Sequence, residues 1–221
     1  MAEAKLPNRG VEVQVAYPVK KTQVVISAGS VVDFSGDAIV NAANRGGLGG
    51  GGVDGAINSA GGPELIAARR ELPVLDDSEY GDRIRTGEAR VTIGGKLAVK
   101  WVIHAVGPIY WEVEGDDFKA ADDLLYAAYA SSLNIAKEKE VKSLAFCLLS
   151  AGIFRGERAL SAVLEIGCQA VKDHVYDGLE EVHIVAFTET EIDELLAAAQ
   201  RVFSGSKTFV RGRSCPQCTM Q

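Results

Sequence analysis

The sequence predicts an α/β protein in which helices cover both faces of a central mixed β-sheet, a three-layer α/β/α sandwich. Short apolar segments that suit strands alternate along the chain with longer segments whose apolar residues recur at helical spacing. Several strand segments are apolar without interruption, as in strands that are buried on both faces of a sheet. With 221 residues, 47% of them hydrophobic, the chain can bury the core of one such domain.

Strands are expected where short apolar or alternating segments lie between turn residues such as glycine and proline. In chain order these segments are residues 11–17, 23–27, 38–40, 88–93, 97–106, 144–149 and 182–187. Helices are expected where apolar residues recur every three or four positions, and a first helix should begin near Asp54. The further helical segments are residues 63–72, 118–140, 157–175 and 192–202, with Thr188 as the N-cap of the last.

The body of the domain is expected to span residues 22–203. Residues 1–21 supply an N-terminal strand and a connection that belong to the same domain. Residues 204–221 contain few core residues and are expected to form a flexible tail. Cys215 and Cys218 in this tail are half of a zinc site, and no metal is expected without a second ligand pair.

Charge and hydropathy argue against two classes of partner. A net charge of −7 and an isoelectric point near 5.1 disfavour broad capture of nucleic acid, which needs clustered Lys and Arg. No stretch approaches the roughly 18 apolar residues of a membrane span, and residues 1–10 are polar, unlike a signal peptide. Cys147 and Cys168 lie in apolar surroundings and are expected to be reduced. We therefore expect a soluble monomer of the cytoplasm or nucleus, with no membrane partner.

Residues 37–62 are the most informative stretch. Asn41 and Asn44 follow an apolar strand, at the sheet edge where α/β proteins bind ligands. Residues 46–52 contain six glycines in seven positions, so their backbone can approach a bound group closely. Asp54 follows, where a helix begins and its N–H groups point outward. An anionic ligand would be stabilised at this position.

A second glycine-bearing loop, residues 150–156, also follows an apolar strand, and the two loops could clamp a diphosphate. Gly47, Gly49 and Gly52 formally match the dinucleotide fingerprint. That fingerprint has its first glycine directly after the strand, whereas four residues intervene here. A dinucleotide-binding oxidoreductase subunit is therefore the weaker alternative. Because no Gly-Lys-Ser/Thr triplet ends the loop, a nucleoside-triphosphate P-loop is not expected.

Several motifs follow one another in a specific order: NAAN at 41–44, LGGGGVDGAI at 48–57, TGEA at 86–89, VIHAVGP at 102–108 and SAGIF at 150–154. Together they resemble the macrodomain family, in particular its MacroD-type ADP-ribose hydrolases. The resemblance covers about residues 22–202. It implies an ADP-ribose ligand with its diphosphate between the two glycine loops, and no cofactor. It also implies removal of ADP-ribose from acidic side chains or deacetylation of O-acetyl-ADP-ribose.

The resemblance assigns the catalytic roles to Asn44 and Asp54. Asn44 matches the residue that hydrogen-bonds the distal ribose, and Asp54 matches the catalytic aspartate, which could orient the ribose and activate a water. Without the motif, Asn44 would be explained as a turn residue and Asp54 as a helix N-cap. His104, within its apolar strand, is expected to be structural.

The resemblance also predicts which residues line the ADP-ribose site. Phe154 would pack on the distal ribose and Phe187 near the adenine, while both loops present N–H groups to phosphate oxygens. The full predicted binding set is Ser30, Val31, Ala43, Asn44, Gly49, Gly50, Gly51, Gly52, Val53, Asp54, Ser150, Ala151, Gly152, Ile153, Phe154, Arg155 and Phe187.

Departures from the family pattern are expected to affect affinity or rate. Ser30 stands where the family usually has an aspartate that accepts from the adenine amino group. Asn58 replaces a histidine that helps hold the active loop. Arg155 and Gly156 replace Gly-Tyr, which brings a cation near the phosphates. Arg45 replaces a small residue near the distal ribose, and with Arg155 it could recognise acidic groups on a protein substrate.

These observations predict a hydrolase that removes ADP-ribose from mono-ADP-ribosylated proteins, its partners, by cleaving ester linkages to Glu or Asp. The first alternative is a reader module that binds ADP-ribose without turnover. Asp54 favours the enzyme, because binding alone needs only the glycine loops and Asn44.

Overall fold

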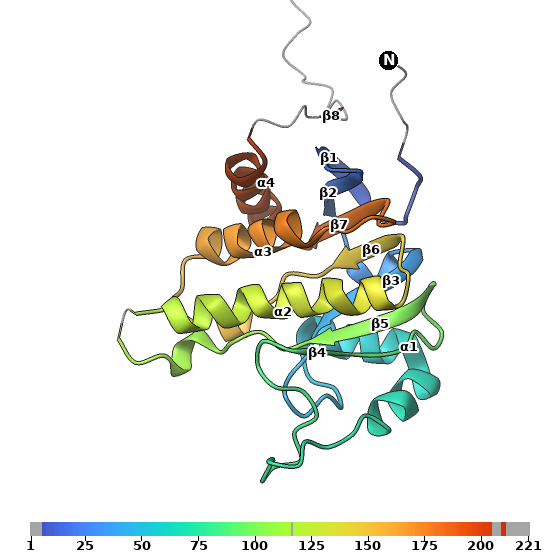
Figure 1. Ribbon diagram of the computed structural model, residues 1–221, viewed down its shortest axis with the longest axis vertical. Coiled ribbons are helices and arrows are strands. Elements are labelled where there is room, and N and C mark those ends of the chain that lie inside the picture. The colour runs from blue at the N-terminus through green and yellow to red at the C-terminus, as the bar shows by residue number, and fades with distance from the viewer. Residues whose placement is uncertain (1–5, 116, 205–208, 211–221) are drawn as a thin grey trace, which may run out of the picture.

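The computed structural model describes residues 6–115, 117–204 and 209–210, and its centre is one mixed sheet (Figure 1). The strands are β1 (Glu12–Val19), β2 (Thr22–Ala28), β3 (Gly36–Ala42), β4 (Ala89–Ile93), β5 (Val99–Ala105), β6 (Ser143–Phe146), β7 (Glu181–Ala186) and β8 (Phe209–Val210). Across the sheet their order is β4-β5-β3-β6-β7-β2-β1-β8. All seven predicted strand segments are therefore present.

The middle of the sheet is parallel. The adjacent strands β5, β3, β6, β7 and β2 run in one direction. At one edge β4 pairs antiparallel with β5, and at the other β1 pairs antiparallel with β2 and with β8. Strands β6 and β7 are buried along their whole length, which explains their uninterrupted apolar character. The carboxyl ends of the five parallel strands meet at one edge of the sheet.

In the described ranges, four α-helices cover the sheet: α1 (Gly52–Arg70), α2 (Lys119–Glu138), α3 (Leu160–His174) and α4 (Glu189–Phe203). Because connections between parallel strands are right-handed, the direction in which the chain crosses the sheet decides the face that a helix covers. The chain crosses one way through α1 and the opposite way through α2 and α3. Figure 1 accordingly shows α4, α3 and α2 stacked along one side of the sheet and α1 on the other. The predicted three-layer sandwich is confirmed.

Helix α1 bends sharply at Gly62. The sequence predicted a helix start near Asp54 and a separate short helix from Pro63, and the structure joins both into one helical segment with a break between them. Gly62 has φ 71° and ψ −164°, a backbone conformation that residues with a Cβ rarely adopt. Pro63 opens the second half, where its missing N–H is tolerated. The bend turns Arg69 back toward the first turn of the helix.

The other helices begin close to the predicted positions. Thr188 is the N-cap of α4, as predicted, because its side chain accepts from the Glu191 N–H. The Glu191 carboxylate in turn accepts from the Thr188 N–H, which completes a capping box. Strand β6 and helix α3 are shorter than predicted, because residues 147–159 leave the sheet as a loop at its carboxyl edge.

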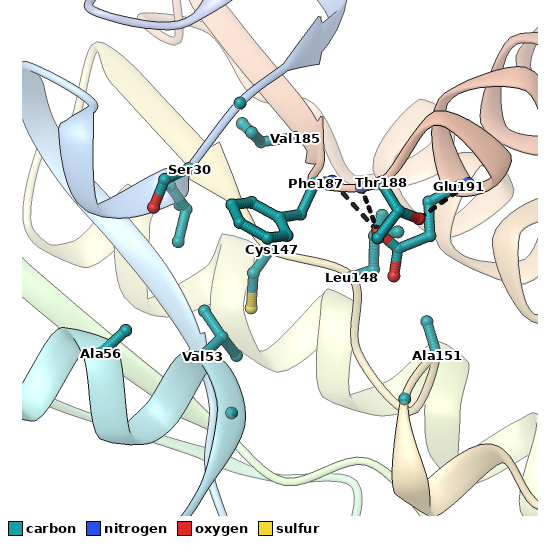
Figure 2. A pocket seen from close by; sticks show the side chains of 14 residues that line it. Ser30, Val53, Ala56, Cys147, Leu148, Ala151, Val185, Phe187, Thr188 and Glu191 are labelled. Carbon is teal, nitrogen blue, oxygen red and sulfur yellow. Dashed lines mark hydrogen bonds between the residues drawn. The ribbon is translucent and has the colours of Figure 1, made fainter.

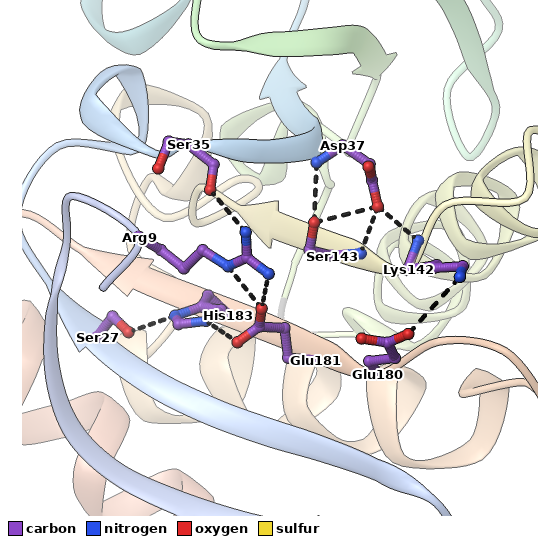
Figure 3. A network of polar contacts seen from close by, with 9 residues as sticks. All are labelled: Arg9, Ser27, Ser35, Asp37, Lys142, Ser143, Glu180, Glu181 and His183. Atoms are coloured by element: carbon purple, nitrogen blue, oxygen red, sulfur yellow. Dashed lines mark hydrogen bonds and ion pairs between the residues drawn. The ribbon is translucent and has the colours of Figure 1, made fainter. Parts of the chain in front are cut away.

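At the opposite edge of the sheet, a polar network ties the amino ends of β3, β6 and β7 to the segment before β1 (Figure 3). Arg9 Nε donates to Glu181 Oε1 at 2.6 Å, and His183 Nε2 lies 3.3 Å from Glu181 Oε2. Asp37 Oδ2 accepts from the Ser143 N–H at 2.9 Å. Because Glu181 and His183 are buried, this network fixes the segment around Arg9 to the sheet.

Within residues 6–115, 117–204 and 209–210, no helix is both long and apolar enough to cross a membrane. The same ranges contain no cluster of three or more His, Cys, Asp or Glu side chains that could hold a metal ion. Cys147 and Cys168 are buried free thiols. Most of the predicted tail, including Cys215 and Cys218, lies outside the described residues; the structure describes Ser204 and β8, which pairs with β1.

Candidate functional site

Two adjoining cavities lie along the carboxyl edge of the five parallel strands. Their volumes are about 420 and 480 Å³, and both have Gly52, Val53, Leu148 and Gly152 in their walls. The segments that follow all five parallel strands contribute to these walls. This is the edge at which open α/β sheets bind ligands.

The first cavity lies between the loops that follow β2, β6 and β7 (Figure 2). Most of its wall is apolar, and Phe187 stands at its side with 74% of its surface exposed. The wall residues are Gly29, Ser30, Val31, Gly52, Val53, Ala56, Cys147, Leu148, Ala151, Gly152, Val185, Phe187, Thr188 and Glu191. A flat, largely apolar part of a ligand would pack well here.

Two polar side chains of the first cavity also stabilise the ends of neighbouring elements. Ser30 Oγ accepts from the Val32 N–H at 3.3 Å and caps a short 3-10 turn. Glu191 Oε2 accepts from the N–H groups of Phe187 and Thr188 at 3.1 and 2.8 Å. Each side chain retains capacity to accept a further hydrogen bond from a ligand.

The second cavity lies between the glycine loop, residues 46–52, and the loop after β6. Its wall residues are Ala42, Ala43, Asn44, Gly50, Gly51, Gly52, Val53, Asp54, Gly107, Leu148, Ser150, Gly152, Ile153 and Phe154. The first turn of α1 borders this cavity, and the first N–H groups of a helix have no partner within the helix. Ser150 Oγ donates to Pro108 O at 2.8 Å and so fixes the second loop. The cavity therefore suits an anionic group.

Asn44 shapes the glycine loop. Its Nδ2 donates to Gly49 O at 2.9 Å, and its Oδ1 accepts from the Gly47 N–H at 3.1 Å. A Cβ atom at Gly50 would lie 3.2 Å from both Asn44 Nδ2 and Asp54 Oδ2. Asn44 and Asp54 therefore face the same glycine in the wall of the second cavity, and a side chain between them would be crowded.

Asp54 is almost fully buried and forms an ion pair with Arg69, which has none of its surface exposed. Arg69 Nη1 donates to Asp54 Oδ1 at 2.5 Å, and Nη2 donates to Oδ2 at 3.3 Å. The same guanidinium donates to Gly47 O at 2.6 Å and to Asn58 Oδ1 at 3.2 Å. The N-cap of α1 is Gly51, which makes no side-chain cap. The N-cap explanation of Asp54 is therefore wrong, because its carboxylate binds Arg69 instead.

Polar contacts continue from Asp54 into the sheet. Asn41 Nδ2 donates to Asp54 Oδ1 at 2.7 Å and lies 3.0 Å from His104 Nδ1. On the other side of the ring, His104 Nε2 lies 2.9 Å from Thr92 Oγ1. Burial, together with the nearby Arg69 charge, holds the pKa of His104 well below its ordinary value. His104 is thus a neutral side chain with a hydrogen-bond partner at each ring nitrogen, in agreement with the predicted structural role.

The Macro domain family model matches residues 40–164 of the chain. The chain belongs to the macro domain family. A macro domain-containing protein of Streptomyces griseus is 40% identical over 172 residues, which cover 76% of this chain and 92% of that protein. A protein of Escherichia fergusonii named O-acetyl-ADP-ribose deacetylase is 37% identical over 171 residues, covering 76% and 90%. A variant of the Oceanobacillus iheyensis macrodomain, solved with ADPR, has a TM-score of 0.73 and 29% identity, covering 84% and 96%.

The cavities of this macro domain bring together most of the predicted binding set. Those in the walls are Ser30, Val31, Ala43, Asn44, Gly50, Gly51, Gly52, Val53, Asp54, Ser150, Ala151, Gly152, Ile153, Phe154 and Phe187. Gly49 and Arg155 lie outside both walls. Gly49 supplies the carbonyl that Asn44 binds, and the Arg155 guanidinium donates to the carbonyls of Ala151 and Arg158 at 3.2 and 2.7 Å. This geometry does not favour the expected contact of Arg155 with phosphate, because backbone carbonyls already bind its guanidinium.

Arg45 also has a partner within the macro domain. Its Nη2 lies 2.6 Å from Asp82 Oδ2, and the side chain is 58% exposed. With Asp77 and Arg85 it lines a separate cavity of about 280 Å³. An acidic group on a substrate would have to compete with Asp82 for Arg45, so the expected recognition of acidic groups by Arg45 together with Arg155 is not preformed.

Sequence reasoning missed several residues that the structure places at the site, among them Arg69, Glu191 and Cys147. Arg69 gave no signal, because a cation in the last turn of a helix is ordinarily explained by the helix dipole. Glu191 was recognisable as a capping-box residue after Thr188, but not as part of a cavity wall. Cys147 was expected only in the core. Burial raises the pKa of its thiol to about 12, so the side chain stays protonated and unreactive at neutral pH.

The topology of this macro domain also bears on the oxidoreductase alternative. A dinucleotide-binding domain places its glycine-rich turn directly after the first strand of a parallel sheet. Here the glycine loop follows β3, which lies between β5 and β6 in a mixed sheet. The glycine loop therefore does not occupy the position in the sheet that a dinucleotide-binding site requires, which argues against the oxidoreductase alternative.

Proposed function

We propose that this macro domain binds ADP-ribose and hydrolyses esters of it, both O-acetyl-ADP-ribose and proteins mono-ADP-ribosylated on Glu or Asp. The observation that supports this most is the position of Asn44 and Asp54, which face Gly50 together at the wall of the second cavity. Similarity to a protein named O-acetyl-ADP-ribose deacetylase supports the same class of reaction.

In the proposed complex the adenine occupies the apolar first cavity, against Phe187 and beside Ser30. The diphosphate lies along the wall residues that the two cavities share, and N–H groups of α1 and of the second loop bind its oxygens. The distal ribose occupies the second cavity, between Phe154 and Asn44. The reaction uses no cofactor.

The proposed role of Asp54 is that of a general base. Its Oδ1 already accepts from Asn41 and Arg69, so Oδ2, which faces Gly50, is the oxygen available to a water. The water oxygen bonds to the acyl carbon of the ester while Oδ2 takes its proton. The bond from that carbon to the ribose oxygen then breaks, and the proton passes to the ribose oxygen. The products are ADP-ribose and a carboxylic acid.

The second candidate function is that of a reader that binds ADP-ribose without turnover. One observation favours it: both oxygens of Asp54 already accept hydrogen bonds from buried donors. Fewer lone pairs are then left for a water than in an unpaired carboxylate.

Turnover measurements separate the two candidates. The protein is incubated with O-acetyl-ADP-ribose and, separately, with a transferase auto-modified on acidic side chains, and the released products are quantified. We expect release from both substrates, micromolar ADP-ribose affinity of roughly −8 kcal/mol and much weaker NAD affinity by calorimetry. Asp54→Asn, which preserves side-chain size, should lower turnover roughly a hundredfold or more with little change in ADP-ribose affinity.

Tight ADP-ribose binding without release from either substrate would favour the reader over the enzyme. Full turnover in a folded Asp54→Asn protein would remove Asp54 from its proposed role. NAD affinity equal to that for ADP-ribose would contradict the proposed ligand itself.

A further inference from the structure

We propose that Arg69 is a positioning residue, which orients the carboxylate of Asp54 and anchors the glycine loop for ester hydrolysis. The inference rests on the proposed function, because it concerns how that site is held for turnover. Arg69 itself is fully buried beneath the second cavity and does not line it.

Within the described part of the chain, all the hydrogen bonds of the Arg69 guanidinium go to groups at the site. They reach both carboxylate oxygens of Asp54, the carbonyl of Gly47 and the side chain of Asn58. Gly47 belongs to the glycine loop, and Asp54 and Asn58 belong to the first turns of α1. One side chain therefore fixes the loop and the helix start relative to each other.

Stability alone is a poor explanation for a buried guanidinium at this place. Removing a charge from water costs several kcal/mol, and apolar residues of similar volume often replace a buried ion pair without loss of stability. A planar fork of donors does, however, fix the orientation of a carboxylate more strictly than packing can. The buried position of Arg69 is thus better explained by a role in fixing the groups that it binds than by a contribution to stability.

The backbone of α1 is shaped so that this contact can form. Asp54 and Arg69 are 15 residues apart, which would separate them by roughly 22 Å along a straight helix. The positive φ of Gly62 breaks the helix, and the second half returns toward the first. A backbone conformation that residues with a Cβ rarely adopt therefore brings Arg69 to the site.

Asn41 completes the orientation of the carboxylate from the sheet side. Its Nδ2 donates to Oδ1 of Asp54, the same oxygen that receives the shorter bond from Arg69. Among the residues that the structure describes, Oδ2 accepts only the longer bond from Arg69, at 3.3 Å, and it faces Gly50. Arg69 and Asn41 together determine which carboxylate oxygen is presented to a bound substrate.

The experiment is a double-mutant cycle between Arg69 and Asp54. Turnover of O-acetyl-ADP-ribose, ADP-ribose affinity and melting temperature are measured for Arg69→Gln, Arg69→Lys, Asp54→Asn and the Arg69→Gln/Asp54→Asn pair. Arg70→Gln is the matched control, because Arg70 is the exposed neighbour on the same turn. We expect Arg69→Gln to lower kcat about 30-fold to 100-fold, as a displaced catalytic group does, with ADP-ribose affinity within about fivefold. Arg69→Lys keeps the charge without the fork and should be intermediate.

The cycle tests whether Arg69 acts through Asp54. In the Asp54→Asn background, Arg69→Gln should lower turnover no further. An equal loss in both backgrounds, or wild-type kcat in folded Arg69→Gln, would overturn the inference while leaving the proposed function standing. If Arg69→Gln is unfolded at the assay temperature, Arg69→Lys is compared with wild type instead. A kcat of Arg69→Lys equal to that of wild type would then overturn the inference. If the wild-type protein binds ADP-ribose but releases no acetate, the proposed function itself is contradicted, and the inference about Arg69 is contradicted as well.

Discussion

Ser30 is the residue at which the proposed adenine site departs most clearly in charge from the macrodomain pattern. Its hydroxyl lies in the wall of the first cavity and accepts one backbone N–H, from Val32. A neutral hydroxyl is a weaker acceptor for an adenine amino group than a carboxylate, because charge-assisted hydrogen bonds are roughly twice as strong. ADP-ribose should therefore bind less tightly than it would with a carboxylate at residue 30.

Ser30→Asp should tighten ADP-ribose binding tenfold or more, because a hydrogen bond to a charged acceptor contributes about 1.5 to 3 kcal/mol. The 3-10 turn should persist, since Asp caps a turn as well as Ser does. Calorimetry with ADP-ribose measures the gain, and Ser30→Asn serves as the control that keeps the cap without adding charge. Equal affinities of all three proteins would place the adenine away from residue 30.

Residues that act within a short stretch of chain were predictable from the sequence, and residues that act across the fold were not. Asn44 and Asp54 belong to one continuous motif, and both reach the second cavity. Arg69 reaches the same place only because the chain reverses at Gly62, which the spacing of apolar residues does not reveal. Glu191 lies in the first cavity only because β7 pairs with β2.

Helix α1 couples the backbone conformation at Gly62 to the proposed active site. Gly62→Ala should destabilise the protein by about 1 to 3 kcal/mol, since φ 71° is strained for a residue with a Cβ. The added Cβ would also lie 3.2 Å from Lys96 Cδ. Because the second half of α1 carries Arg69, the substitution should in addition lower ester turnover in the folded protein.

Gly178→Ala is the control for the kink in α1. Gly178 also has a positive φ of 105°, and an added Cβ would have open space within 4 Å. It lies in the turn before β7, at the edge of the sheet opposite the cavities. Urea unfolding should show a loss of stability for both variants, whereas turnover should fall only for Gly62→Ala. Equal turnover would mean that the bend does not position Arg69.

Apolar periodicity predicted the secondary structure elements, but it misplaced the end of an element where apolar residues line a cavity. Residues 144–149 form an apolar run and were predicted as one strand, but β6 ends at Phe146. Cys147 and Leu148 then serve as cavity walls, and burial against a pocket gives the same apolar signal as burial within a sheet. The break in α1 was predicted at its correct place by Pro63, although the reversal of direction was not.

The arrangement of the strands could be inferred only through resemblance to the macrodomain family. Periodicity identifies strands but does not say which of them pair, because pairing depends on contacts between distant segments. Here β2 pairs with β7, near the other end of the chain, and β3 lies between β5 and β6. That order brings five carboxyl ends to one edge, and the cavities follow from it.

The edge of the sheet opposite the cavities contains a buried charge pair whose contribution depends on pH (Figure 3). Glu181 is 3% exposed and binds Arg9, while His183 contacts its other carboxylate oxygen. Burial by itself raises the pKa of Glu181, but hydrogen bonds from His183 and Arg9 and the Arg9 charge outweigh it, so the pKa lies below its ordinary value. Such a carboxylate adds stability above its unfolded pKa, near 4.3, and loses that contribution as the pH falls through the folded pKa.

Arg9→Met should therefore destabilise the protein most at neutral pH. It leaves Glu181 buried without its cation, and we expect a loss of roughly 3 kcal/mol, at the lower end for a broken buried pair because the Arg9 side chain is 25% exposed. Urea unfolding at several pH values from 7 down to 3 measures the free energy of unfolding. The difference from wild type should shrink as the pH falls through the lowered folded pKa of Glu181, because the carboxylate then becomes protonated in the wild-type protein as well. Lys21→Met, which breaks the exposed pair with Asp177, should change stability little at any pH. A loss for Arg9→Met that stayed constant across this range would mean that Arg9 stabilises the sheet through packing and not through the charge of Glu181.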